Sequence, residues 1–99
     1  MRLSEEILKV IKTLAIKYFG ENCEVRIFGS RTDDTQKGGD IDIYISTEMK
    51  DGIIEAKASF LAELKIKIGE QKIDIIVENI SKPEKNSIYE IARTCGIKI

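Results

Sequence analysis

Apolar residues recur at helical spacing in two segments of the chain. Residues 4–19 and 53–68 both place them three or four positions apart, which predicts an amphipathic helix in each segment. Ser4 is a suitable N-cap for the first helix. Gly20 and Gly69 follow the last periodic residue of each segment, and glycine is the usual residue just beyond a helix. The two helices are therefore expected to end there.

Three shorter segments have the composition and patterning of β-strands. They are residues 25–28, 40–45 and 72–77. The second alternates strictly, so its isoleucines share one face while Asp40, Asp42 and Tyr44 share the other. We therefore expect a strand with a core face and an open face, with Tyr44 exposed on the open one.

The predicted helices and strands are distributed along the whole chain. A Ser-x-x-Glu capping box opens a short last helix over residues 87–95. The expected order is helix, strand, strand, helix, strand, helix. At 99 residues the chain can bury one modest core, so residues 1–99 are expected to form a single domain.

Composition and charge exclude several classes of protein. The chain is 42% hydrophobic and 33% charged, as in ordinary globular proteins, and its formal net charge is −1. This balance gives no basic footprint for direct nucleic-acid binding. No apolar run approaches the roughly 18 residues of a membrane span, and the N-terminus does not resemble a signal peptide. We expect a cytoplasmic protein.

The chain has two cysteines and no histidine. Cys23 and Cys95 lie far apart in the sequence and form no zinc pattern, so we expect reduced, partly buried thiols. Without histidine, Ser-His and Cys-His nucleophilic catalysis is impossible. A general base must then be a carboxylate, a lysine or a tyrosine.

The aspartates on the predicted strands are the candidate chemical groups. Asp40 and Asp42 project from the same face of one strand, where two carboxylates can share a Mg²⁺ ion. Asp74 would join them if its strand paired beside theirs, as a metal ligand or as a base. An Asp-x-Asp pair alone is more often a solvated face. Aspartate is nevertheless disfavoured in strands, and three occur in two isoleucine-rich ones.

A Gly-Ser turn precedes the paired aspartates. Gly29 and Ser30 follow a predicted buried strand, and such a turn can hold a phosphate through backbone N–H groups and a hydroxyl. The pair alone is weak, and the glycine spacings of a Walker loop or a dinucleotide fingerprint are absent. Its value lies in its position, because only nine residues separate Ser30 from Asp40.

Together these residues resemble the minimal nucleotidyltransferases, the smallest members of the DNA polymerase beta-like superfamily. That family has a Gly-Ser turn, a loop of about ten residues, Asp-x-Asp on the next strand and a third aspartate on a later one. Here these are Gly29, Ser30, Asp40, Asp42 and Asp74. The resemblance covers the whole chain. It implies an α+β fold with a short mixed sheet of about three strands flanked by helices.

The resemblance also implies an enzyme that transfers AMP from ATP with release of pyrophosphate. In that scheme Asp40 and Asp42 hold Mg²⁺, and Asp74 activates the acceptor hydroxyl or binds a second metal ion. Gly29 and Ser30 bind the terminal phosphates, assisted by Arg31. The chain departs from the family in its loop, which begins with acidic residues, and at residue 39, where glycine replaces a common serine.

The acceptor implied by the resemblance is a partner protein. Proteins of this family often pair with a HEPN-type toxin and attach AMP to one of its tyrosines, thereby acting as antitoxins. A chain of this length has little room for its own acceptor-recognition domain, which favours a complex. Two alternatives remain open: a non-catalytic antitoxin or nucleotide-binding module that neutralises its partner by contact, and a small domain with a merely acidic surface. The isoleucine-rich strand edges could also mediate self-association, giving a homo- or hetero-oligomer.

Overall fold

The computed structural model describes residues 4–28, 41–69, 72–80 and 96–99. These residues form two helices and four strands. In chain order they are α1 (Glu5–Phe19), β1 (Glu24–Phe28), β2 (Ile41–Thr47), α2 (Ile53–Ile68), β3 (Ile73–Asn79) and β4 (Ile97–Lys98). Both long helices and all three predicted strands are confirmed, with ends that differ by at most two residues. The helix predicted over residues 87–95 lies outside the described residues.

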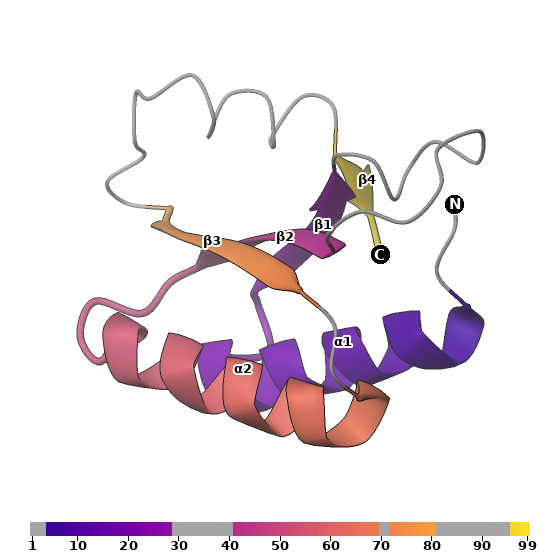
Figure 1. The fold of residues 1–99 in the computed structure, drawn as a ribbon. Helices are drawn as coiled ribbons and strands as arrows, with labels where there is room; N and C mark the ends of the chain where they lie inside the picture. The colour runs from indigo at the N-terminus through magenta and orange to yellow at the C-terminus, as the bar shows by residue number, and fades with distance from the viewer. Residues whose placement is uncertain (1–3, 29–40, 70–71, 81–95) are drawn as a thin grey trace.

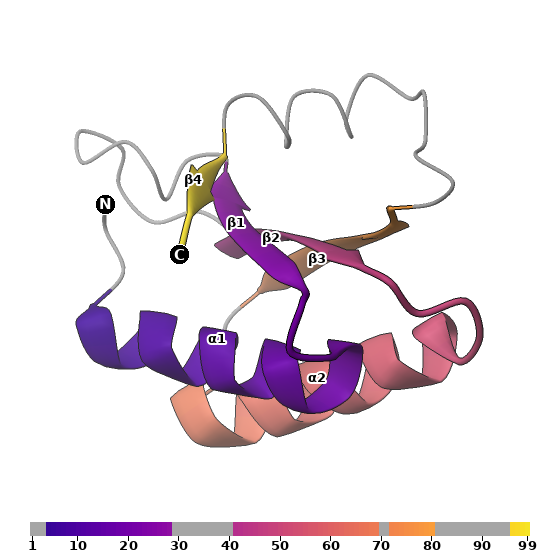
Figure 2. The same ribbon diagram turned by 180° about the vertical axis from the view of Figure 1, so that it is seen from behind.

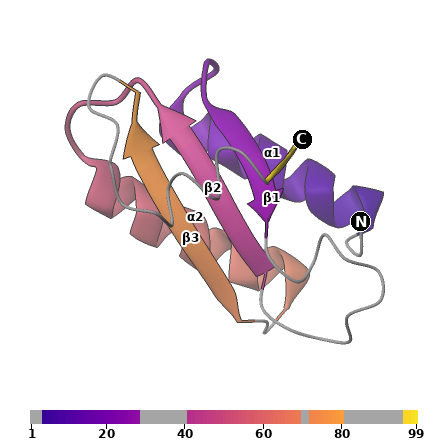
Figure 3. The same cartoon turned by 90° about the horizontal axis from the view of Figure 1, so that it is seen from above.

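The four strands form one mixed sheet in the order β3-β2-β1-β4. β1 pairs antiparallel with β2 and with β4, whereas β2 and β3 run parallel. Helix α2 provides the crossover that parallel neighbours require. Seen from above, β3, β2 and β1 lie side by side over the helices (Figure 3). The mixed sheet confirms the expected α+β class, and β4 makes it one strand wider than predicted.

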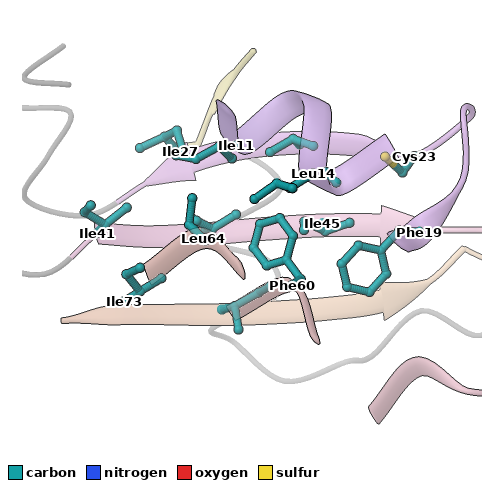
Figure 4. Packing of buried hydrophobic residues seen from close by; sticks show 14 of the residues in the cluster. Ile11, Leu14, Phe19, Cys23, Ile27, Ile41, Ile45, Phe60, Leu64 and Ile73 are labelled. Carbon is teal, nitrogen blue, oxygen red and sulfur yellow. The ribbon is translucent and has the colours of Figure 1, made fainter. Parts of the chain in front are cut away.

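Both helices cover the same face of the sheet. They lie together below it, and the view from behind shows the same two layers (Figures 1 and 2). The core between the layers contains the alternate side chains of β1, β2 and β3 that the sequence assigns to one face, and Ile27, Ile43 and Ile45 are all 0% exposed. Phe19 and Phe60 meet there from the two helices, with ring centroids 5.7 Å apart (Figure 4). The helices are therefore held by burial of their apolar stripes.

Polar contacts hold the ends and flanks of the helices. The N–H group of Ile7 donates to the Ser4 hydroxyl at 3.2 Å, which confirms the predicted N-cap of α1. On the outer side, the Lys17 ammonium and the Tyr18 hydroxyl of α1 both donate to Glu63 of α2, at 2.8 and 2.5 Å. These two hydrogen bonds, that of Lys17 first, lower the pKa of the Glu63 carboxyl. Its negative charge therefore links the two helices.

The cysteine at the end of the first loop is structural. Cys23 is 7% exposed and belongs to the core between sheet and helices (Figure 4). Burial raises the pKa of its thiol, which makes the reactive thiolate less accessible. The expected burial is confirmed for Cys23, which is a free cysteine, and Cys95 lies outside the described residues.

Candidate functional site

The candidate carboxylates lie on the sheet face opposite the two helices. Asp42 of β2 and Asp74 of β3 are direct register partners in the parallel pair. Neighbouring strands lie about 4.8 Å apart, and side chains of such partners project from the same face. The two carboxylates, far apart in sequence, are therefore side by side. Asp74 was expected to join Asp42 if their two strands paired side by side, and the two strands do pair.

The core fixes this juxtaposition. Asp42 lies between Ile41 and Ile43, both 0% exposed, and Asp74 lies between Ile73 and Ile75, which are 8% and 7% exposed. A slip of either strand by one residue would turn its isoleucines to the open face and its aspartate into the core. Asp42 is half-buried and Asp74 is exposed. The burial of four isoleucines thus holds two acidic groups next to each other on an accessible surface.

The other predicted site residues lie outside the described residues. They are Gly29, Ser30, Arg31 and Asp40, all on the segment between β1 and β2. The described residues that border this segment are Phe28, the register partner of Asp42, and Ile41, its chain neighbour. The described residues on either side of this segment therefore both lie beside Asp42.

The two described aspartates suit a hard divalent cation. Mg²⁺ prefers oxygen ligands, and it commonly takes one or two carboxylates and completes its shell with water and phosphate oxygens. Asp42 and Asp74 supply such a pair. Among the described residues no group of three or more histidine, cysteine, aspartate or glutamate side chains could hold a metal ion, and Asp40 is not among these residues. The donor set present fits Mg²⁺ as a two-carboxylate site.

Tyr44 is buried, and the prediction that it is exposed is wrong. It is 2% exposed and forms a second small apolar cluster with Phe28 and Ile76 on the face that carries the aspartates. Its hydroxyl donates to Glu78 at 2.6 Å, and Glu78 is itself 3% exposed. Strict alternation assigns residues to a face but does not say whether that face is covered. Sequence reasoning also missed Glu78, which shares a strand face with Asp74 at positions four apart.

The buried tyrosine–glutamate pair joins β2 to β3 next to the aspartates, which gives a stability prediction. Tyr44→Phe leaves Glu78 with one donor fewer in a buried setting, and we expect a loss of about 1–2 kcal/mol in the free energy of unfolding. Urea unfolding measures it. Tyr18→Phe is the matched control, because its hydroxyl also donates to a glutamate but at an accessible site, and its loss should be smaller. An equal loss in both variants would contradict the role of burial.

Comparison with known proteins decides the family. The family model described as "Nucleotidyltransferase domain" matches residues 5–98. The chain belongs to this family. The nucleotidyltransferase domain thus spans every described helix and strand, and the α+β arrangement is consistent with the polymerase beta-like fold. Membership supports nucleotidyl transfer as the general activity.

A search among curated proteins found no match to this nucleotidyltransferase domain. Within the described ranges, neither helix is long and apolar enough to cross a membrane.

Proposed function

We propose that this nucleotidyltransferase domain transfers AMP from ATP to a hydroxyl group, with a Mg²⁺ ion held by Asp42 and Asp74 and by Asp40. The observation that carries the proposal is the in-register pair Asp42 and Asp74. Two carboxylates side by side repel each other, and a cation between them removes that cost. Family membership independently supports transfer of a nucleotide.

Each residue has a defined task in the proposed reaction. The acceptor oxygen forms a bond to the α-phosphorus of ATP while the bond to the bridging oxygen breaks, and pyrophosphate leaves. Asp74, the more exposed of the described pair, takes the proton of the acceptor hydroxyl. The metal ion, when bound, offsets negative charge on the phosphates. Gly29, Ser30 and Arg31 bind the terminal phosphates, as the resemblance to minimal nucleotidyltransferases implies.

The proposed acceptor is a tyrosine of a HEPN-type partner protein, which gives the domain an antitoxin role. The support is the resemblance of Gly29, Ser30, Asp40, Asp42 and Asp74 to the motif of the minimal nucleotidyltransferases. The accessible position of Asp74 is compatible with a hydroxyl that arrives on another molecule.

The test uses ATP labelled at either the α- or the γ-phosphate, with Mg²⁺ and the protein encoded by the neighbouring gene. Transfer of AMP puts α-label, and no γ-label, on a tyrosine of the neighbour. Asp51→Asn, a change of an exposed aspartate before α2, should leave the labelling intact. Transfer of γ-label would show a kinase and overturn the proposal. Neutralisation of the neighbour without any label would favour the non-catalytic antitoxin.

Metal binding gives a second prediction, on stability. A ligand present at ten times its dissociation constant stabilises the folded state by about 1.4 kcal/mol, which raises the Tm of a domain of this size by roughly 5–10 °C. We expect Mg²⁺ to raise the Tm of the wild type in this way and to have a smaller effect on Asp74→Asn. Thermal unfolding followed by circular dichroism, with Ca²⁺ and K⁺ as controls, measures the shift. An identical shift in both proteins would exclude Asp74 as a ligand.

A further inference from the structure

Helix α2 carries a row of exposed apolar side chains along its outer side. Its members lie four residues apart and are Ile54, Ala58, Ala62 and Ile66. Both isoleucines are 81% exposed, more than any other large apolar residue described. Single exposed isoleucines are ordinary, but a continuous apolar row on one helix marks an interaction surface.

The row has the shape that two crossing helices need. Residues four apart form a ridge inclined to the helix axis, and the commonest helix packing interdigitates two such ridges. Ala58 and Ala62 are small, so a second helix can approach closely at the middle of the row. Ile54 and Ile66 are large and stand where two crossing helices diverge and the gap between them widens. The side chains of the row are isoleucine, alanine, alanine and isoleucine, so their order is the same in both directions along α2.

The charges beside the row identify the second helix. Glu55 is next to Ile54, and Lys65 is next to Ile66; both are exposed, and neither forms an ion pair with another described residue. If α2 of a second copy packs antiparallel on the row, Glu55 of each copy lies beside Lys65 of the other. A two-fold axis forms this opposite-charge contact twice. A parallel arrangement would instead place like charges together.

We propose that this row is the interface of a homodimer, in which α2 packs antiparallel on its own copy about a two-fold axis near Ala58 and Ala62. The contact is independent of the proposed transfer reaction. Both helices lie on one side of the sheet (Figures 1 and 2). Asp42 and Asp74 project from the other side, because they alternate with isoleucines that are buried in the core. The dimer therefore leaves both carboxylates accessible. One helix pair is a small interface, and a weak, concentration-dependent dimer is expected.

Sedimentation equilibrium of the purified chain, from about 1 to 500 µM, tests the dimer. Ala62→Glu should weaken it at least about tenfold, since a charge would be buried at the crossing point, while glutamate preserves the helix. Thr13→Glu, on the exposed side of α1, is the matched control and should change nothing. A wild type that is monomeric throughout, or a dimer that Ala62→Glu leaves intact, overturns the proposal. The proposal is also overturned if the chain is monomeric and the row is covered by a different protein.

A charge exchange tests the antiparallel arrangement separately. Glu55→Lys and Lys65→Glu should each weaken the dimer severalfold, because each places like charges together. The double variant restores opposite charges across the axis and should recover most of the affinity. Failure of the double variant to recover would overturn the arrangement. None of these positions belongs to the proposed transfer site, so labelling of an acceptor should be unchanged in every variant.

Discussion

Replacing either Asp42 or Asp74 with asparagine is expected to lower the rate of nucleotidyl transfer at least about a hundredfold, which corresponds to about 2.7 kcal/mol of transition-state stabilisation. Asparagine keeps the size of the side chain but removes the charge that attracts Mg²⁺. Each residue sits between core isoleucines, so the exchange should leave the fold intact. The initial rate of labelling from α-labelled ATP measures the loss.

Two controls separate this effect from unfolding. Asp74 is exposed, so Asp74→Asn should change the free energy of unfolding in the absence of metal by less than about 0.5 kcal/mol. Asp51→Asn should keep full activity. A variant of either strand aspartate that is folded and retains more than a tenth of the wild-type rate would contradict the proposed site.

The two proposed roles of Asp74 predict different dependences of the transfer rate on Mg²⁺ concentration. If Asp74 only binds the cation, a higher Mg²⁺ concentration restores much of the rate of Asp74→Asn. If it also takes the acceptor proton, as proposed, saturating Mg²⁺ leaves the rate of Asp74→Asn low. The transfer rate of Asp74→Asn at saturating Mg²⁺ decides between them.

Most of the fold could be predicted from sequence because its periodicities are strong. The spacing of apolar residues in 53–68 gave the bounds of α2 without error. The juxtaposition of Asp42 and Asp74 followed from the alternation of isoleucine and aspartate, once β2 and β3 were neighbours. A strand–helix–strand connection favours parallel neighbours, but periodicity alone cannot establish which strands pair.

Two features had no usable local signal. β4 contains only Ile97 and Lys98, and two residues cannot show a period; its place beside β1 depends on pairing with Arg26 and Ile27. Burial of Tyr44 depends on what covers the second face of the sheet, which the alternation of β2 does not encode. Glu78 offered a weak clue, because a glutamate in an isoleucine- and valine-rich strand is unusual, but its partner Tyr44 is 34 residues away.

Phe60→Ala is expected to cause the largest loss of stability, about 3–5 kcal/mol in the free energy of unfolding. Phe60 is 0% exposed and packs at a tilt against Phe19, so its removal opens a cavity where α2 meets both α1 and the sheet (Figure 4). Domains of this kind have only about 5–15 kcal/mol of stability in total. Urea unfolding measures the loss, and Leu61→Ala, at the neighbouring half-buried position, should lose less. A loss below about 1 kcal/mol would contradict this packing.

The effect of Phe60→Ala on activity should depend on temperature, unlike that of the aspartate variants. Helix α2 is the crossover that connects β2 to β3, so unfolding of its contact with the sheet removes the support for the Asp42–Asp74 register. While the protein is folded, however, both carboxylates are present. Phe60→Ala should therefore transfer nucleotide at a near wild-type rate in the cold and lose activity at its lowered Tm. Asp42→Asn should keep its strongly lowered rate at every temperature. If Phe60→Ala were inactive while still folded, α2 would have to act on the site through something other than support of the two strands.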